Sequence, residues 1–140
     1  MTLPRLKQKV LFICNHNSAR SQMAEGLLKS LYGEFYDVYS AGSNPSTINP
    51  YAVKVMTEIG IDISDYRSKS IKEFMWVTFD YVITLCGVEG EGCPFFPGGE
   101  NYLHKSFEDP AALTGTENDK LDAFRMIRDQ IRDWIEETFR

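Results

Sequence analysis

The 140-residue chain has little positive charge, few cysteines and no long apolar run. Its 15 lysines and arginines are outnumbered by 20 aspartates and glutamates, which gives a net charge of −5. This charge excludes the broad basic field that holds nucleic acids or anionic membranes, so we expect neither as a partner. No apolar stretch approaches the roughly 18–20 residues that span a bilayer, and the polar start lacks the features of a secretory signal. We therefore expect a cytoplasmic protein.

The three cysteines are too few for a disulfide framework, and an odd number cannot all pair within the chain. A structural zinc site is also a poor fit, because two thiols and at most His16 or His104 lack the usual paired spacings. We expect neither a metal nor a cofactor. The thiols are then either inert and buried or a reactive set, and their places in the fold decide between the two.

Strand and helix patterns alternate along the chain. Continuous apolar runs are typical of strands covered on both faces, and the expected strands are residues 9–13, 36–40, 81–85 and 101–107. A helical period begins at about Ser18. A second helix is predicted from Asn49-Pro50, an N-cap followed by proline, to a stop at Gly60. The pattern from Thr116 to Asp119 resembles a capping box and opens a long amphipathic helix.

This alternation predicts the α/β class, with a small four-stranded parallel sheet flanked by helices. At 140 residues the chain suits one domain, residues 1–140, and we expect a monomer. Ligands of such sheets bind beyond the carboxyl ends of the strands. Cys14 follows the first strand and Cys86 a later one, so both are expected at that edge.

The segment from Cys14 to Ser21 links a buried strand to the start of a helix. A tight loop in this place turns backbone N–H groups inward and forms an anion-binding nest. Those amides would stabilise a thiolate at Cys14, and the planar fork of Arg20 suits two oxygens of a tetrahedral oxyanion. The alternative is an inert Cys14 and a solvated Arg20. The residues expected to bind the oxyanion are Asn15, His16, Asn17, Ser18, Ala19, Arg20 and Ser21.

Cysteine, five residues, arginine and serine form the active-site signature of cysteine phosphatases. The run HNSARSQMAE at residues 16–25, with YSAG at 39–42, resembles the arsenate reductases related to low-molecular-weight tyrosine phosphatases. The resemblance extends over essentially the whole chain and implies their flavodoxin-like fold. Some members carry glycine where this chain has His16. Histidine adopts a left-handed conformation less freely than glycine does.

The resemblance also implies a mechanism and a partner. Cys14 attacks arsenate while Asp109 protonates the departing oxygen. Asp109 stands in an Asp-Pro pair, which by itself is an ordinary turn signal. Cys86 then attacks the sulfur of Cys14 and arsenite leaves. Cys93 attacks Cys86, and thioredoxin reduces the resulting Cys86–Cys93 disulfide. The loop between these two cysteines contains three glycines, which suits a segment that has to move.

Two other functions stay open at this point. A plain tyrosine or small-molecule phosphatase would use the same loop, but it does not need Cys86 and Cys93. Phosphatase relatives also tend to carry an aromatic residue where this chain has Ala111. A redox switch or metalloid-binding protein would use the thiols but leave Arg20 and Asp109 without a task.

Some further residues carry weaker expectations. By resemblance, Glu25 and Ser40 line a cation site with Asn17, where several relatives add an aspartate and hold potassium. This chain has Lys69 instead of that aspartate, and its ammonium either replaces the ion or is simply solvated. We expect His104 at the surface or at a strand edge. The aromatic residues expected in the core are Trp76, Trp134, Phe95 and Phe96.

Overall fold

Four short strands form one parallel sheet in the computed structural model, which describes residues 6–86 and 94–139. The strands are β1 (Gln8–Cys14), β2 (Tyr36–Gly42), β3 (Phe79–Thr84) and β4 (Gly99–His104). Their order is β2-β1-β3-β4, and every neighbouring pair is parallel. This confirms the expected α/β class and the four-stranded parallel sheet.

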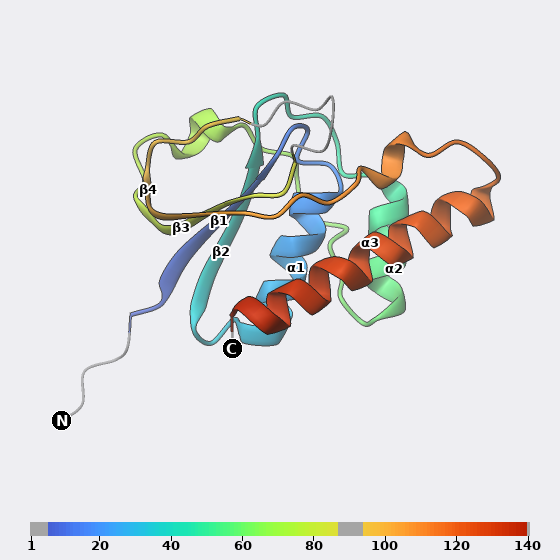
Figure 1. Cartoon of the computed structure of the whole chain (residues 1–140), viewed down its shortest axis with the longest axis horizontal. Coiled ribbons are helices and arrows are strands. Elements are labelled where there is room, and N and C mark those ends of the chain that lie inside the picture. The colour runs from blue at the N-terminus through green and yellow to red at the C-terminus, as the bar shows by residue number, and fades with distance from the viewer. Residues whose placement is uncertain (1–5, 87–93, 140) are drawn as a thin grey trace.

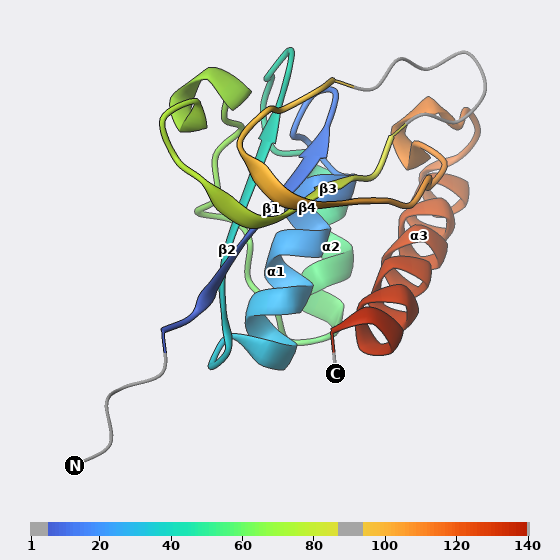
Figure 2. The same ribbon diagram turned by 60° about the vertical axis from the view of Figure 1, so that its left-hand side comes forward.

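Three helices cover one face of this sheet (Figure 1). They are α1 (Arg20–Tyr32), α2 (Pro50–Glu58) and α3 (Glu117–Thr138). The opposite face is covered by the short 3₁₀ helix η1 (Ile71–Phe74) and by the segment that leads into β4, as the turned view shows (Figure 2). A second 3₁₀ helix, η2 (Pro110–Ala112), precedes α3. Both faces of β1 are thereby buried, because alternate side chains of this strand enter two separate apolar clusters.

The helix ends follow the expected local signals with one shift. The Asn49 side chain accepts a hydrogen bond from the Tyr51 amide, and Gly60 just beyond α2 has a φ of 80°. Thr116 and Asp119 form the expected capping box. Helix α1 begins at Arg20 and not at Ser18, because the residues before Arg20 belong to the loop that starts at Cys14.

Two aromatic expectations were wrong. Trp76 is 98% exposed and Phe95 is 74% exposed, whereas Phe96 is buried and Trp134 is partly buried against the core. Val77 and Phe96 pack into the apolar cluster on the η1 face, so their neighbours Trp76 and Phe95 are left outside it. In the described part of the chain, no helix is long and apolar enough to cross a membrane.

Candidate active site

The loop between β1 and α1 turns its carbonyl groups away from the site. The carbonyl oxygens of Asn15, His16 and Ser18 accept hydrogen bonds from the amides of Asn44, Ser46 and Asn49. The Asn17 carbonyl accepts from the side chains of Gln22 and Ser68. In a planar trans peptide the C=O and the following N–H point in opposite directions. The amides that follow these carbonyls therefore point toward the inside of the loop, as an anion-binding nest requires.

One residue takes the left-handed backbone that this loop needs, and it is Asn17 and not His16. Asn17 has a φ of 49° and is the only non-glycine residue with positive φ in the described ranges. Asparagine tolerates this conformation better than most residues. The Asn17 side-chain oxygen accepts hydrogen bonds from the Lys69 amide and from Gln22, which fixes the orientation of its amide group.

Gly42 at the end of β2 allows this strand to approach the loop closely. A Cβ atom at Gly42 would lie 2.5 Å from the Asn15 carbonyl oxygen and 2.8 Å from the Asn17 nitrogen. Any other residue would push the loop away from the sheet.

The Cys14 thiol is buried and contacts a series of hydrogen-bonded polar side chains. Cys14 is 2% exposed, and its sulfur lies 2.8 Å from the Ser21 hydroxyl oxygen. The Ser21 oxygen accepts a hydrogen bond from the Asn17 side-chain nitrogen at 2.8 Å. Both Asn17 and Ser21 are fully buried, so they lie behind the loop and support it.

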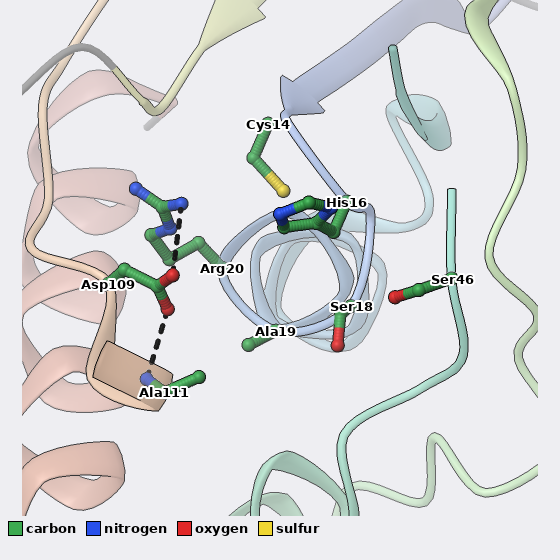
Figure 3. A pocket seen from close by; sticks show the side chains of 8 residues that line it. All are labelled: Cys14, His16, Ser18, Ala19, Arg20, Ser46, Asp109 and Ala111. Carbon is green, nitrogen blue, oxygen red and sulfur yellow. Dashed lines mark hydrogen bonds and ion pairs between the residues drawn. The ribbon is translucent and has the colours of Figure 1, made fainter. Parts of the chain in front are cut away.

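Arg20 and Asp109 lie together beside the thiol (Figure 3). The Arg20 guanidinium donates to the Phe107 carbonyl and lies 3.8 Å from an Asp109 carboxylate oxygen. The other Asp109 oxygen accepts a hydrogen bond from the Ala111 amide. The side chain of Arg20 is 3% exposed and that of Asp109 is 32% exposed. The carboxyl group is therefore open to a ligand, while the guanidinium forms the buried wall.

These groups line one small cavity. Its volume is about 70 Å³, so it admits only a small ligand or the tip of a larger one. Its lining residues are Cys14, His16, Ser18, Ala19, Arg20, Ser46, Asp109 and Ala111. Sequence reasoning missed Ser46, which follows β2 in a loop with no motif of its own. An oxyanion here would meet a nucleophilic sulfur, inward amides, a guanidinium and a carboxyl group.

Cys86 lies at the same edge of the sheet as Cys14. Strands β1 and β3 are neighbours, and the Leu85 amide donates to the Ile13 carbonyl at 2.9 Å. The residues that follow these two, Cys14 and Cys86, are therefore at adjacent strand ends, and both are buried. Cys14 is a free thiol, whereas Cys86 is disulfide-bonded. Cys93 lies outside the described residues.

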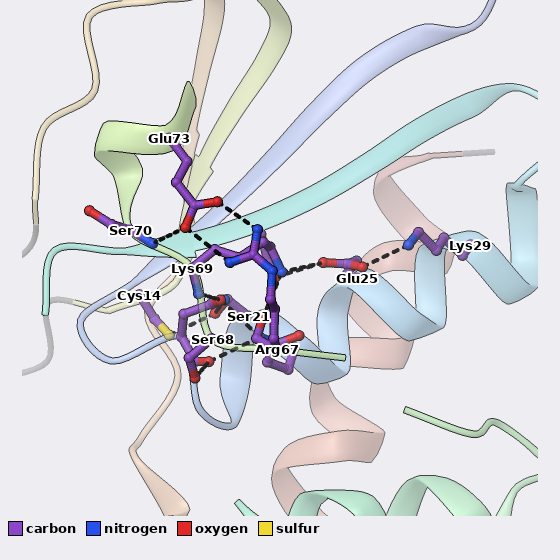
Figure 4. A network of polar contacts seen from close by, with 12 residues as sticks. Cys14, Ser21, Glu25, Lys29, Arg67, Ser68, Lys69, Ser70 and Glu73 are labelled. Carbon is purple, nitrogen blue, oxygen red and sulfur yellow. Dashed lines mark hydrogen bonds and ion pairs between the residues drawn. The ribbon is translucent and has the colours of Figure 1, made fainter. Parts of the chain in front are cut away.

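Behind the loop, Glu25 is a buried carboxylate between two lysines (Figure 4). The ammonium of Lys29 lies 2.7 Å from one Glu25 oxygen, and that of Lys69 lies 3.7 Å from the other. The Ser40 hydroxyl donates to Glu25 as well. The side chain of Lys69 is 14% exposed, so the solvated alternative was wrong. Burial lowers the pKa of Lys69 below its ordinary value although the nearby Glu25 carboxylate favours the charged form.

Comparison with known proteins places the chain in a family. The family model of the low molecular weight phosphotyrosine protein phosphatases matches residues 9–139. The chain belongs to this family. An arsenate reductase of Halalkalibacterium halodurans is 46% identical over 125 residues, which cover 89% of this chain and 90% of that protein.

Solved structures of arsenate reductases are similar to this chain in fold and sequence. An arsenate reductase in the phosphate binding state has a TM-score of 0.79 and 37% identity, over 93% of this chain and 95% of that chain. A thioredoxin-dependent arsenate reductase of Corynebacterium glutamicum has a TM-score of 0.65 and 34% identity. That match covers 94% of this chain and 61% of the other.

Proposed function

We propose that this chain is an arsenate reductase that converts arsenate to arsenite with Cys14, Cys86 and Cys93, and that thioredoxin restores its thiols. The observation that carries the proposal is the placement of Cys86 at the strand end beside Cys14. Hydrolysis of a phosphoester needs only the loop, Arg20 and an acid. A second buried sulfur at the same edge serves electron transfer.

The first step forms a bond between sulfur and arsenic. The Cys14 thiolate attacks As(V) while the inward amides and Arg20 hold the other oxygens. Asp109 gives a proton to the departing oxygen, which leaves as water. Arg20 lies 3.8 Å from this carboxyl group, so both reach the same end of the anion.

The second step moves two electrons to arsenic. The Cys86 thiolate attacks the Cys14 sulfur, the sulfur–arsenic bond breaks, and its electron pair stays on arsenic as As(III). Arsenite leaves, and a Cys14–Cys86 disulfide remains. Cys93 then attacks Cys86, which frees Cys14 and leaves a Cys86–Cys93 disulfide. A thioredoxin dithiol reduces this disulfide by the same exchange chemistry.

The test is NADPH oxidation by thioredoxin reductase and thioredoxin, with arsenate as the final acceptor. We expect oxidation to require arsenate, thioredoxin and this protein together. Cys14→Ser is the matched control, because it removes the nucleophile and leaves the two other thiols. Arsenate-independent oxidation, or none with the unmodified protein, would contradict the proposal.

A further inference from the structure

A series of hydrogen bonds runs from β3 to the backbone of Cys86. The Thr84 hydroxyl oxygen lies 2.6 Å from His104 Nδ1, and His104 Nε2 lies 2.9 Å from the Ser106 hydroxyl oxygen. The Ser106 hydroxyl in turn donates to the Cys86 carbonyl at 3.4 Å. None of these three side chains lies in the cavity beside Cys14.

The last link sets the direction of all the others. Because the Ser106 proton points to the Cys86 carbonyl, the Ser106 oxygen accepts from His104 Nε2–H. With the proton on Nε2, His104 accepts at Nδ1 from the Thr84 hydroxyl. Every donor in this series then meets an acceptor.

The position of this series of hydrogen bonds indicates its role. Backbone hydrogen bonds fix the residues before Cys86: the Lys105 amide donates to Thr84, the Phe107 amide to Leu85, and the Leu85 amide to Ile13. Ser106, between the first two donors, uses its side chain to hold the next carbonyl. Cys86 is thus the boundary between the hydrogen-bonded sheet edge and the glycine-containing loop of the sequence. A sulfur that has to meet one partner after another gains from a main chain that keeps its place.

We infer that His104, acting through Ser106, is a positioning residue that holds the Cys86 main chain while the Cys86 sulfur changes partners. This rests on the proposed function, because only the relay uses Cys86. His104 does not touch the substrate. It restricts the directions from which the Cys86 sulfur approaches Cys14.

The experiment isolates the Cys86 step in a single turnover. In a Cys93→Ser background, arsenate is added to reduced protein, and thiol trapping with mass spectrometry follows formation of the Cys14–Cys86 disulfide. Ser106→Ala and His104→Ala should each slow this step about fivefold, the effect of one ordinary hydrogen bond. The double variant should be no slower than either single variant, since both cut the same chain.

Two controls separate positioning from loss of structure. His104→Gln keeps a donor near the place of Nε2 and should recover most of the rate. Lys105→Ala changes an exposed neighbour on the same segment and should match the parent. The affinity for inorganic phosphate, which reports on the loop at Cys14, should be unchanged in all variants.

The outcomes are distinguishable. If the parent forms the disulfide and both single variants form it equally fast, the inference is wrong while the proposed function stands. Additive losses in the double variant, or weaker phosphate binding that accounts for the loss, would also overturn it. If the parent forms no disulfide with arsenate, the proposed function fails and the inference falls with it.

Discussion

The Ser21 hydroxyl oxygen lies 2.8 Å from the Cys14 sulfur and accepts a hydrogen bond from the side-chain nitrogen of Asn17. Because the Asn17 side-chain nitrogen donates a hydrogen bond to the Ser21 oxygen, the Ser21 hydroxyl can donate its own hydrogen to the sulfur. This hydrogen bond holds the sulfur of the nucleophile in place. The buried side chains of Asn17 and Ser21 therefore connect the loop to the Cys14 sulfur.

Loss of the Ser21 hydroxyl should slow every reaction that begins at Cys14. A hydrogen bond to a charged group contributes about 1.5–3 kcal/mol, so Ser21→Ala should lower kcat/KM for arsenate about 10- to 100-fold. Steady-state kinetics check this, with Ser30→Ala on the exposed part of the same helix as the control. An unchanged kcat/KM in Ser21→Ala would show that this contact does not support the nucleophile.

Each cysteine variant should stop at a different species, because each thiol has its own step. Cys14→Ser should do no chemistry on arsenate. Cys93→Ser should accumulate a Cys14–Cys86 disulfide after one turnover, which peptide mapping detects. Steady multiple turnover in Cys93→Ser would remove Cys93 from the mechanism.

Phosphoester cleavage should separate the loop from the relay. The loop and Asp109 suffice for hydrolysis, so weak activity on an aryl phosphate should survive in Cys86→Ser. The same activity should vanish in Cys14→Ser and in Arg20→Ala. Equal losses in all three variants would mean that Cys86 supports the fold or the loop.

The sequence predicted the fold wherever local pattern decides structure. The apolar run of β1 and the capping box at Thr116 and Asp119 depend on neighbours in sequence, and both were found as expected. The predicted start of the first helix, at about Ser18, was too early. The residues before Arg20 belong to the loop that follows Cys14, so α1 begins only at Arg20. Periodicity also failed at Trp76, since a single aromatic residue in a turn carries no signal of which side it faces.

The site residues were predictable by type but not by geometry. The motif identified Cys14, Arg20 and Ser21. The left-handed backbone falls on Asn17, whose side chain accepts a hydrogen bond from the amide of Lys69, far away in sequence. The capping box of Ser70 and Glu73, which starts η1, had a readable signature that was overlooked. The Ser106 contact with Cys86 had none, because it joins two segments through the sheet.

Acid should weaken the contact between α2 and α3 through Glu58. Hydrogen bonds from Arg125, with further help from Arg128, lower the pKa of Glu58 below its ordinary 4.5. The folded state therefore favours the carboxylate, and its stabilising effect is present above pH 4.5 and lost as the pH falls through the lowered value. Glu58→Gln should reduce the free energy of unfolding by about 0.5–1 kcal/mol at neutral pH for this half-exposed group.

Urea unfolding across the acid range measures this effect. The difference between Glu58→Gln and the unmodified protein should shrink as the pH falls, whereas the exposed Glu34→Gln should match the unmodified protein throughout. A difference that stays constant with pH would assign it to packing and not to charge.

Potassium and sodium salts at equal ionic strength should give nearly the same activity and melting temperature. The Lys69 ammonium lies 2.9 Å from the Arg67 carbonyl and 3.7 Å from Glu25, so the chain itself supplies a cation among these oxygens. Lys69→Ala removes that cation and leaves Glu25, with its side chain 6% exposed, to Lys29 and Ser40. The variant should melt at a lower temperature, because a buried carboxylate loses part of its compensation. Potassium should restore part of the loss by entering the space. Clearly higher activity or melting temperature of the unmodified protein in potassium than in sodium would instead indicate a bound ion. It would contradict the idea that Lys69 replaces that ion.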